Sequence, residues 1–282
     1  MAGTLFVVAT PIGNLEDITV RALRILREAT LIAAEDTRRT AHLLARHAIT
    51  TPTTSLHEHN ESTKSASLVA RLQRGDSIAL VSDAGTPTVS DPGAELIREV
   101  IAAGIRVEPI PGPSAVLAVL AASGLPTETF SFMGFPPTRS KDRADWFNRL
   151  RLHGGTIVFF EAPHRIRETL VELQLAVGDC PVVVGRELTK IHEELVRGQI
   201  SEVLKSLRSD KGEFVIAISI GLKTEITVQL PPSGSEIAAE LGEMTAIEGM
   251  TKRKAINAVA RRHGMAPNEV YELVEAAKKS GV

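Results

Sequence analysis

Short apolar runs alternate with amphipathic stretches over the first 110 residues. The strand-like runs lie at residues 5–10, 31–34, 78–81 and 105–110, with a possible short strand within 50–60. Helical periodicity begins after the capping side chains Asp17 and Thr37, and two further helices end at Gly75 and Gly104. Strands separated by helices are typical of βαβ units, so this region is predicted to form a parallel sheet covered by helices.

A second series of strands follows Gly124 and differs in its connections. The strand-like runs lie at residues 129–135, 156–161, 181–187, 193–198 and 213–220. Helical patterns at 139–152 and 163–177 separate the first three strands, but only a short helix near Leu204 separates the last two. A connection this short favours antiparallel pairing, so the second sheet is predicted to mix parallel and antiparallel pairs.

The remaining chain has a linker-like segment and a helical tail. Residues 221–235 contain Pro231-Pro232 and two glycines, and residues 235–282 follow a helical pattern. The sequence therefore predicts an α/β protein of three parts. These are an N-terminal α/β lobe at 1–122, a C-terminal α/β lobe at 123–222 and a small helical domain at 235–282 that contains a basic segment.

Composition narrows the class of protein. Apolar residues make up 43% and charged residues 23% of the 282 positions, which is typical of a globular chain. The single cysteine, Cys180, excludes an internal disulfide and a zinc site built on a cysteine pair. No apolar stretch approaches the roughly 20 residues that span a bilayer, and the start of the chain lacks the basic segment of a signal peptide. We expect a soluble cytoplasmic protein without membrane contact.

Unusual residues follow four strands of the first lobe. They form the runs 10–14, 35–38, 82–87 and 111–115, rich in Gly, Pro, Asp and Thr. Each run alone is explained by the needs of a turn, but in open α/β sheets ligands bind where the carboxyl ends of strands converge. The chain has no Gly-x-Gly and no Gly-Lys pair, so the dinucleotide and P-loop phosphate sites are excluded. Taken together, the runs predict a ligand site built largely from backbone.

These runs also carry a specific resemblance. Ala9-Thr10-Pro11-Ile12-Gly13-Asn14, Glu35-Asp36-Thr37-Arg38, Ser82-Asp83-Ala84-Gly85-Thr86-Pro87, Pro111-Gly112-Pro113-Ser114-Ala115, Glu161-Ala162-Pro163-His164-Arg165 and Gly185-Arg186-Glu187-Leu188-Thr189-Lys190 occur in this order. The series resembles the ribosomal RNA small subunit methyltransferase I family, which has the tetrapyrrole methylase (class III methyltransferase) fold. The resemblance implies two α/β lobes with an active cleft between them and S-adenosylmethionine as methyl donor. It further implies a homodimer that methylates the 2′-oxygen of a cytidine in the decoding region of 16S rRNA, within the small ribosomal subunit.

The resemblance also implies which residues meet the cofactor. The Gly-Asp-Pro signature of tetrapyrrole methylases falls on residues 85–87, where this chain has Thr in place of the acid. The cofactor-binding positions implied in this way are Pro11, Gly85, Thr86, Pro87, Val89, Ser114, Ala115, Phe160 and Val215. In a pocket made mainly by main chain, backbone groups can bind the polar edge of such a ligand.

The residues that are candidates for a role in the reaction itself each have two interpretations. A ribose hydroxyl is a poor nucleophile, so a base or a neighbouring positive charge should assist it, and Glu187 and Lys190 follow a strand of the second lobe. The same two residues could form a structural ion pair at the strand end. Asp36 and Arg38 similarly fit substrate binding or helix capping, and Asp83 could do no more than fix its own turn.

Local basic patches point to RNA, although the net charge is −2. Residues 139–151 carry a net charge of +3, and Arg165 begins a helix where it could hold a phosphate or simply face solvent. The segment 251–264 is basic without a single acid and contains Lys252, Arg253, Lys254, Arg261 and Arg262. A basic run is usually a solvated face, but a single-signed run inside an acidic protein favours RNA contact.

Two alternative functions and a metal site stand beside this hypothesis. The same fold could methylate a tetrapyrrole or another small molecule, or the chain could be a non-catalytic RNA-binding protein. The basic segment of the tail argues against the first, and the complete series of cofactor loops argues against the second. His57 and His59 alternate on a possible strand, but no third ligand lies nearby, so no metal is expected.

Overall fold

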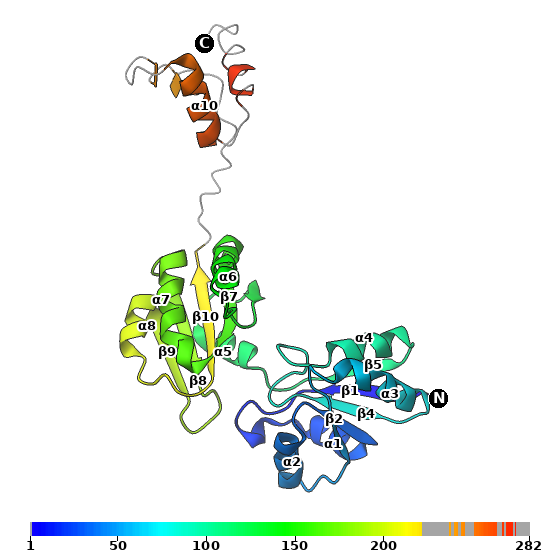
Figure 1. Ribbon diagram of the computed structural model, residues 1–282. Coiled ribbons are helices and arrows are strands. Elements are labelled where there is room, and N and C mark those ends of the chain that lie inside the picture. Colours follow the sequence, from blue (N-terminus) through cyan, green and yellow to red (C-terminus); the bar gives the residue numbers. More distant parts are fainter. Residues whose placement is uncertain are drawn as a thin grey trace. The chain divides into compact units, whose positions relative to one another are not determined.

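The computed structural model describes residues 2–221, residues 251–263 and single positions between 237 and 274 (Figure 1). The chain divides into two compact units, Met1–Gly221 and Leu222–Val282. The first unit holds two five-stranded sheets, one in each of two lobes. The segment that the sequence predicts to be a linker lies outside the described residues.

The first lobe contains a parallel sheet, as the sequence predicts. Its strands are β1 (Thr4–Val8), β2 (Leu31–Ala34), β3 (Thr53–Ser55), β4 (Ile78–Val81) and β5 (Arg106–Ile110). Their order is β3-β2-β4-β1-β5, and every neighbouring pair is parallel. The carboxyl ends of β2, β4 and β1 therefore meet at one edge, together with the loops that follow them.

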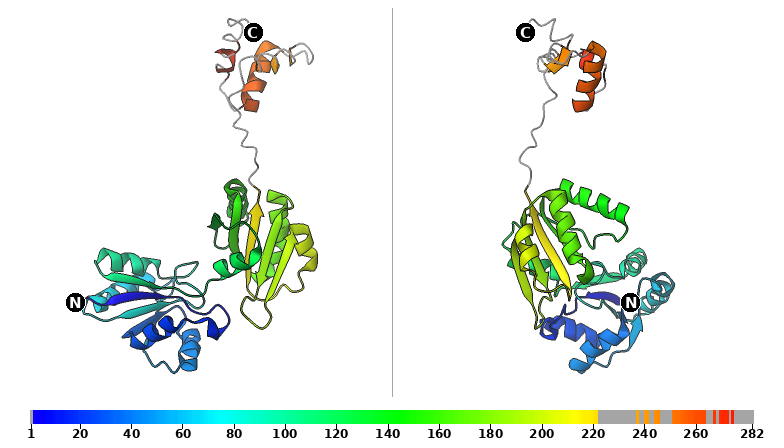
Figure 2. Two further views of the ribbon diagram at one scale, coloured as in Figure 1. Left: turned by 180° about the vertical axis from the view of Figure 1, so that it is seen from behind. Right: turned by 60° about the vertical axis from the view of Figure 1, so that its left-hand side comes forward.

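Helices cover both faces of this sheet (Figures 1 and 2). On one face α1 (Val20–Glu28) and α2 (Thr37–Arg46) share a core with β1 and β2, and on the other α3 (Glu61–Gln73) and α4 (Ala94–Ala102) pack together. Two predicted caps were wrong by one or two residues. Thr19 rather than Asp17 caps α1, because Asp17 ends a 3-10 turn, η1 (Leu15–Asp17), and Asp36 rather than Thr37 caps α2.

The second lobe contains the mixed sheet that the sequence predicts. Its strands are β6 (Phe130–Phe132), β7 (Gly155–Glu161), β8 (Pro181–Arg186), β9 (Glu194–Gln199) and β10 (Phe214–Ile220), in the order β6-β7-β10-β8-β9. Only β6 and β7 pair in parallel. Strand β10, the last strand along the chain, therefore lies at the centre of the sheet. The helices α6 (Ser140–His153), α7 (Ile166–Val177, after the 3-10 turn η2, Pro163–Arg165) and α8 (Ile200–Ser206) share one core with this sheet.

A helix that the sequence pattern did not reveal covers the opposite face of the second sheet. This helix, α5 (Ala115–Ser123), is apolar around most of its circumference, so it shows no amphipathic period. Val116, Val119 and Leu120 are buried against residues of β7, β8 and β10, which include Val158, Val183 and Val215. Although all but the last residue of α5 lies within the predicted first lobe, 1–122, the helix therefore packs on the sheet of the second lobe.

The second unit is described through α10 (Lys252–His263) and a few further positions. Ala255, Val259 and Ala260 are buried in a small apolar cluster that also contains Val270. No helix among the described residues is long and apolar enough to cross a bilayer.

Candidate functional site

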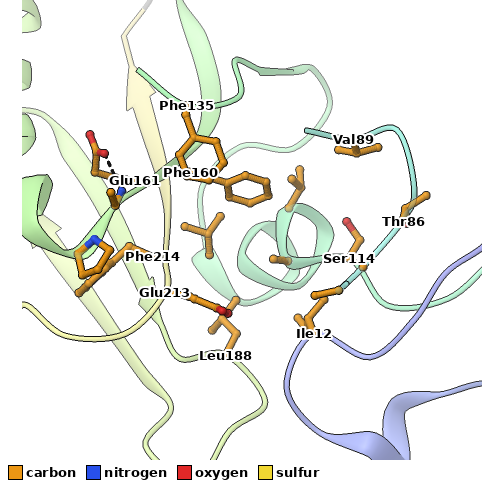
Figure 3. Close-up of a pocket in the computed structure, with 17 residues that line it drawn as sticks. Ile12, Thr86, Val89, Ser114, Phe135, Phe160, Glu161, Leu188, Glu213 and Phe214 are labelled. Carbon is orange, nitrogen blue, oxygen red and sulfur yellow. Dashed lines mark hydrogen bonds between the residues drawn. The ribbon is translucent and has the colours of Figure 1, made fainter. Parts of the chain in front are cut away.

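A cavity of about 400 Å³ is lined by residues of both lobes of the first unit (Figure 3). Its volume lies within the ~300–1,000 Å³ usual for small-molecule sites. The first lobe contributes loop residues that follow β1, β4 and β5, and the second contributes α5 and the ends of β7, β8 and β10. The lining consists of Ile12, Ala84, Gly85, Thr86, Val89, Ser114, Ala115, Val116, Phe135, Phe160, Glu161, Ala162, Pro163, Leu188, Glu213, Phe214 and Val215.

Most positions that the sequence singled out for the cofactor lie around this one cavity. They are Gly85, Thr86, Val89, Ser114, Ala115, Phe160 and Val215. Pro11 instead lines a separate cleft of about 90 Å³ beside α2, and Pro87 is not among the cavity-lining residues. The sequence reasoning missed Ile12, Phe135, Leu188 and Glu213 as lining residues, because their motifs or loops gave no sign of which side chain points inward.

Backbone contacts hold the first-lobe loops against one another. Thr10 and Gly85 exchange two main-chain hydrogen bonds, with N–O distances of 2.8 and 3.0 Å, and Thr86 Oγ1 donates to the carbonyl of Pro113 at 3.4 Å. Gly85 has a φ of +78°, a conformation that residues with a Cβ rarely adopt. Ser114 caps α5 by accepting a hydrogen bond from the Leu117 amide. The wall on this side is therefore made mainly of fixed main chain.

Val89 projects toward the cavity from a strained loop. Its neighbours Thr88 and Ser90 have φ values of +73° and +67°, and a positive φ is a true outlier for a β-branched residue such as Thr88. Such a conformation costs of the order of 1–3 kcal/mol and persists only where the surroundings impose it. The strain coincides with a valine that is 39% exposed at the cavity rim (Figure 3).

Aromatic and aliphatic side chains form the second-lobe wall. Phe160 lies beside Phe135, with ring centroids 5.3 Å apart, and pairs across the sheet with Val215. Leu188 is nearly buried and joins the same apolar cluster as α5. This side of the cavity therefore offers flat apolar surface rather than charge.

Glu161 fixes the turn that closes the cavity after β7. Its side chain is fully buried, Oε1 accepts the Ala162 amide at 2.6 Å and Arg165 Nη2 lies 2.8 Å from the same oxygen. Oε2 accepts a hydrogen bond from the Thr169 hydroxyl. Arg165, which the sequence offered for an RNA phosphate, is only 14% exposed at its side chain and pairs with this carboxylate.

A direct contact joins the lobes beside the cavity. The Asn14 amide donates to Thr189 Oγ1 at 3.0 Å, and Lys190 passes so close to Gly13 that a Cβ there would lie 2.5 Å from Lys190 Cγ. Glycine is therefore required at position 13 by the approach of the second lobe. The neighbouring residues Ile12 and Leu188 line the cavity, so this contact sets the spacing of its two walls.

Glu187 and Lys190 form an ionic network at the same place. Lys190 Nζ lies 3.0 Å from Glu187 Oε1 and 3.0 Å from Glu213 Oε2. Partial burial opposes the charge on Glu187, but hydrogen bonds from the Glu213 amide and from Lys190 outweigh it and lower the pKa of Glu187. Burial likewise opposes the charge on Lys190, but the two carboxylates raise its pKa. A carboxylate with a lowered pKa is a weak base, so Glu187 is better suited to hold the Lys190 ammonium in place than to accept a proton.

Comparison with known proteins identifies the family. The family model for tetrapyrrole (corrin/porphyrin) methylases matches residues 4–204. A protein from Halalkalibacterium halodurans named ribosomal RNA small subunit methyltransferase I is 43% identical over 274 residues, covering 96% of this chain and 94% of that protein. The chain belongs to the ribosomal RNA small subunit methyltransferase I family. Relatives of the same name from Bacillus subtilis (40% identity; 96% of this chain, 93% of the relative) and Xylella fastidiosa (49%; 77% and 81%) agree.

Solved structures share the fold of this methyltransferase family at low sequence identity. A diphthine synthase has a TM-score of 0.62 at 17% identity, covering 77% of this chain and 90% of its own. A uroporphyrin-III C-methyltransferase from Thermus thermophilus, complexed with S-adenyl homocysteine, has a TM-score of 0.55 at 20% identity, covering 77% and 97%. These likenesses confirm the two-lobed tetrapyrrole methylase fold expected from the sequence motifs.

A further predicted position of this family member, Arg38, is not among the residues that line the cavity. Arg38 is 89% exposed at its side chain and pairs with Asp36, whose pKa it lowers to about 2 through their hydrogen bonds. Lys252 lies on α10, with Nζ 5.6 Å from the ring centroid of Tyr271. Lys254 is exposed on the same helix, and the side chains of Arg253, Arg261 and Arg262 lie outside the described residues. Within the described part of the chain, no group of three or more His, Cys, Asp or Glu could hold a metal ion.

Three carboxylates lie near the ends of β2 and β4. Glu35 Oε2 accepts the Asp83 amide at 3.2 Å, and Asp91 lies close enough to both for their charges to act on it. Burial, reinforced by the charges of Glu35 and Asp83, raises the pKa of Asp91 to about 6, against a hydrogen bond with Ser82 that lowers it. Burial also raises the pKa of Glu35.

The raised pKa of Asp91 predicts a pH-dependent stability. The folded chain keeps this proton up to about pH 6, but the unfolded chain loses it near the ordinary value of 3.8. The folded state therefore binds more protons between these values, and the free energy of unfolding falls as the pH rises through this window. We expect Asp91→Asn to raise the free energy of unfolding at pH 7.5 and to leave it unchanged at pH 3.5, measured by urea denaturation. An equal change at both pH values would contradict this assignment.

Proposed function

We propose that the chain uses S-adenosylmethionine to methylate the 2′-oxygen of a cytidine ribose in the decoding region of 16S rRNA. The observation that carries the proposal is the extent of the likeness to the ribosomal RNA small subunit methyltransferases. It covers 274 residues and so includes most of the unit beyond Gly221, together with its basic helix. The uroporphyrin-III C-methyltransferase structure, in contrast, is matched over 97% of its own length but covers only 77% of this chain.

The cavity fits the proposed cofactor. Its volume of about 400 Å³ suits a nucleoside with an amino-acid arm, and Phe160, Phe135 and Val215 provide a flat apolar wall for a purine. The amino end of α5 at Ser114 and Ala115 lies in the opposite wall, where helix amides favour a carboxylate. Bound S-adenosylmethionine would supply an electrophilic methyl group on a sulfonium.

The chain's own residues then position the reactants. The fixed loops at Gly85 and Thr86 and the turn held by Glu161 would orient the cofactor, and orientation supplies much of the rate of an in-line transfer. Lys190 would place positive charge beside the attacking ribose oxygen, and Glu187 would hold Lys190 in place. Pro11, Pro87, Arg165 and the basic side chains of α10 stay predictions from the sequence, as do the homodimer, the cytoplasmic location and the small-subunit context.

The experiment is transfer of label from tritiated S-adenosylmethionine to purified small ribosomal subunits by the full-length chain. We expect label in 16S rRNA. Because a 2′-O-methyl group blocks alkaline cleavage of the adjacent phosphodiester, the label should be recovered in a dinucleotide after alkaline hydrolysis. Label released as a mononucleotide would contradict ribose methylation, and no label in RNA beside an active control methyltransferase would contradict the proposal as a whole.

A further inference from the structure

Helix α2 is a second basic helix, placed within the first unit. Its ten residues, Thr37–Arg46, include three arginines and one histidine and no acid. Arg38, His42 and Arg46 are spaced by four residues, so they lie along one face of the helix, which spans about 12 Å from the first to the last. All three are exposed, whereas Leu43 and Leu44 pack toward the sheet.

A groove continues this basic face across the lobes. It has a volume of about 600 Å³ and is lined by Arg46 of α2, the η1 loop at Asn14–Glu16 and the second-lobe residues Lys190 and His192. The hydrogen bond between Asn14 and Thr189 crosses between its two sides. Since Gly13 lines the groove and its neighbour Ile12 lines the 400 Å³ cavity, the groove and the cavity lie next to each other.

The arginines of α2 stay accessible to a ligand, although two of the three form ion pairs. Arg38 pairs with Asp36 and Arg39 with Asp83, but the arginine side chains are 89% and 66% exposed, so the pairs are weak and leave donors free. Glu16 is the acid that lines the groove, and Lys190 is held between Glu187 and Glu213. Within residues 2–221, Arg46, His42 and His192 form no ion pair.

We propose that Arg38, Arg39, His42, Arg46 and His192, here called the α2 surface, bind the phosphate backbone of the RNA substrate. The proposal rests on the proposed function and extends it by naming the contact through which RNA reaches the cavity. Guanidinium groups match phosphate geometry. A row of basic residues along one helix is better suited to bind a polyanion than to bind a single anion. RNA held here would run past the groove between the lobes, which brings its riboses to the cavity mouth.

A pair of charge-matched double variants tests the α2 surface. In the first, Arg38→Gln/Arg46→Gln removes two charges from α2. In the control, Arg74→Gln/Arg98→Gln removes two exposed arginines from the end of α3 and from α4, on the other face of the same sheet. Affinity for 16S rRNA transcribed in vitro is measured at several salt concentrations, and cofactor affinity is measured by calorimetry.

We expect the α2 variant to bind RNA at least about tenfold more weakly near 0.15 M salt. We also expect its plot of log K against log salt to flatten by about 2, because each phosphate contact contributes about 0.9 to the slope. The control variant should match wild type in both measures, and all three proteins should bind the cofactor equally. Equal weakening of both variants, or of neither, would overturn the proposal.

Two further outcomes separate this proposal from others. If the α2 variant loses methylation of small subunits but binds free 16S rRNA like wild type, the surface contacts a ribosomal protein and the RNA assignment is wrong. Wild-type protein that binds RNA through α2 but transfers no methyl group to it would refute the proposed function and leave the α2 surface supported.

Discussion

Replacing Ala115 with phenylalanine is expected to raise the dissociation constant for S-adenosylmethionine by about 100-fold and to reduce RNA methylation to background. Ala115 is the first residue of α5 and lines the cavity with only a methyl group. A phenyl ring there would project into the space between Ser114 and the second-lobe wall. Overpacking of this kind costs about 1–3 kcal/mol, and 1.4 kcal/mol is tenfold in affinity. Calorimetry measures the first effect and tritium transfer the second.

The matched control is Leu117→Phe on the same helix. Leu117 is 58% exposed and does not line the cavity, so the larger ring should leave affinity and activity as in wild type. Both variants add a ring to α5, which controls for changes in the helix itself. Unchanged cofactor affinity in the Ala115 variant would show that the cofactor binds elsewhere.

Glu161→Gln is expected to lower the free energy of unfolding by about 3 kcal/mol, the largest stability effect that we predict. Glutamine keeps the size of the side chain and can still accept the Ala162 amide. It removes the negative charge that balances Arg165, whose side chain is only 14% exposed. Breaking a buried pair by removing one partner typically costs ~3–5 kcal/mol, because the other charge stays buried without compensation. Urea denaturation at pH 7 measures the loss.

Glu28→Gln provides the comparison. Glu28 Oε2 lies 2.9 Å from Arg24 Nη1, and the side chains of Glu28 and Arg24 are 59% and 56% exposed, so water replaces much of the lost interaction. We expect a loss of less than about 1 kcal/mol, as for other accessible pairs. Similar losses in the two variants would contradict the view that burial makes the Glu161 pair important.

The strands were predictable from sequence because each is a short apolar run bounded by turn residues. Both sheets and the short α8 between β9 and β10 follow from this pattern. The second sheet is mixed as predicted, but its antiparallel pairs are β10 with β7, β10 with β8 and β8 with β9, so the short connection does not join paired strands. Helix α5 was not predictable in the same way. Its residues are apolar on nearly every side, because one side faces a sheet and the amino end faces a cavity. Apolar and polar positions therefore do not alternate with the 3.6-residue period by which an amphipathic helix is recognised.

The site was predictable at the level of loops and less so at the level of side chains. Turn residues after parallel strands must converge, so Gly85, Thr86 and Ser114 could be expected to lie around one cavity. The partner of Arg165 could not be expected, because burial of Glu161 depends on α6 and α7 packing over the end of β7. An arginine four residues after a glutamate looks the same in sequence whether it faces water or a buried carboxylate.

The central place of β10 in the second sheet bears on how the protein is made. During synthesis, residues 214–220 leave the ribosome after all the other strands of the two sheets. Strands β7 and β8 do not pair with each other, because each of them pairs with β10, which lies between them. A nascent chain that stops before this point lacks the middle of a sheet rather than an edge, and it also lacks Glu213, Phe214 and Val215 of the cavity. The first lobe can fold while it emerges, but cofactor-binding capacity arises in a single late step, once this strand is inserted.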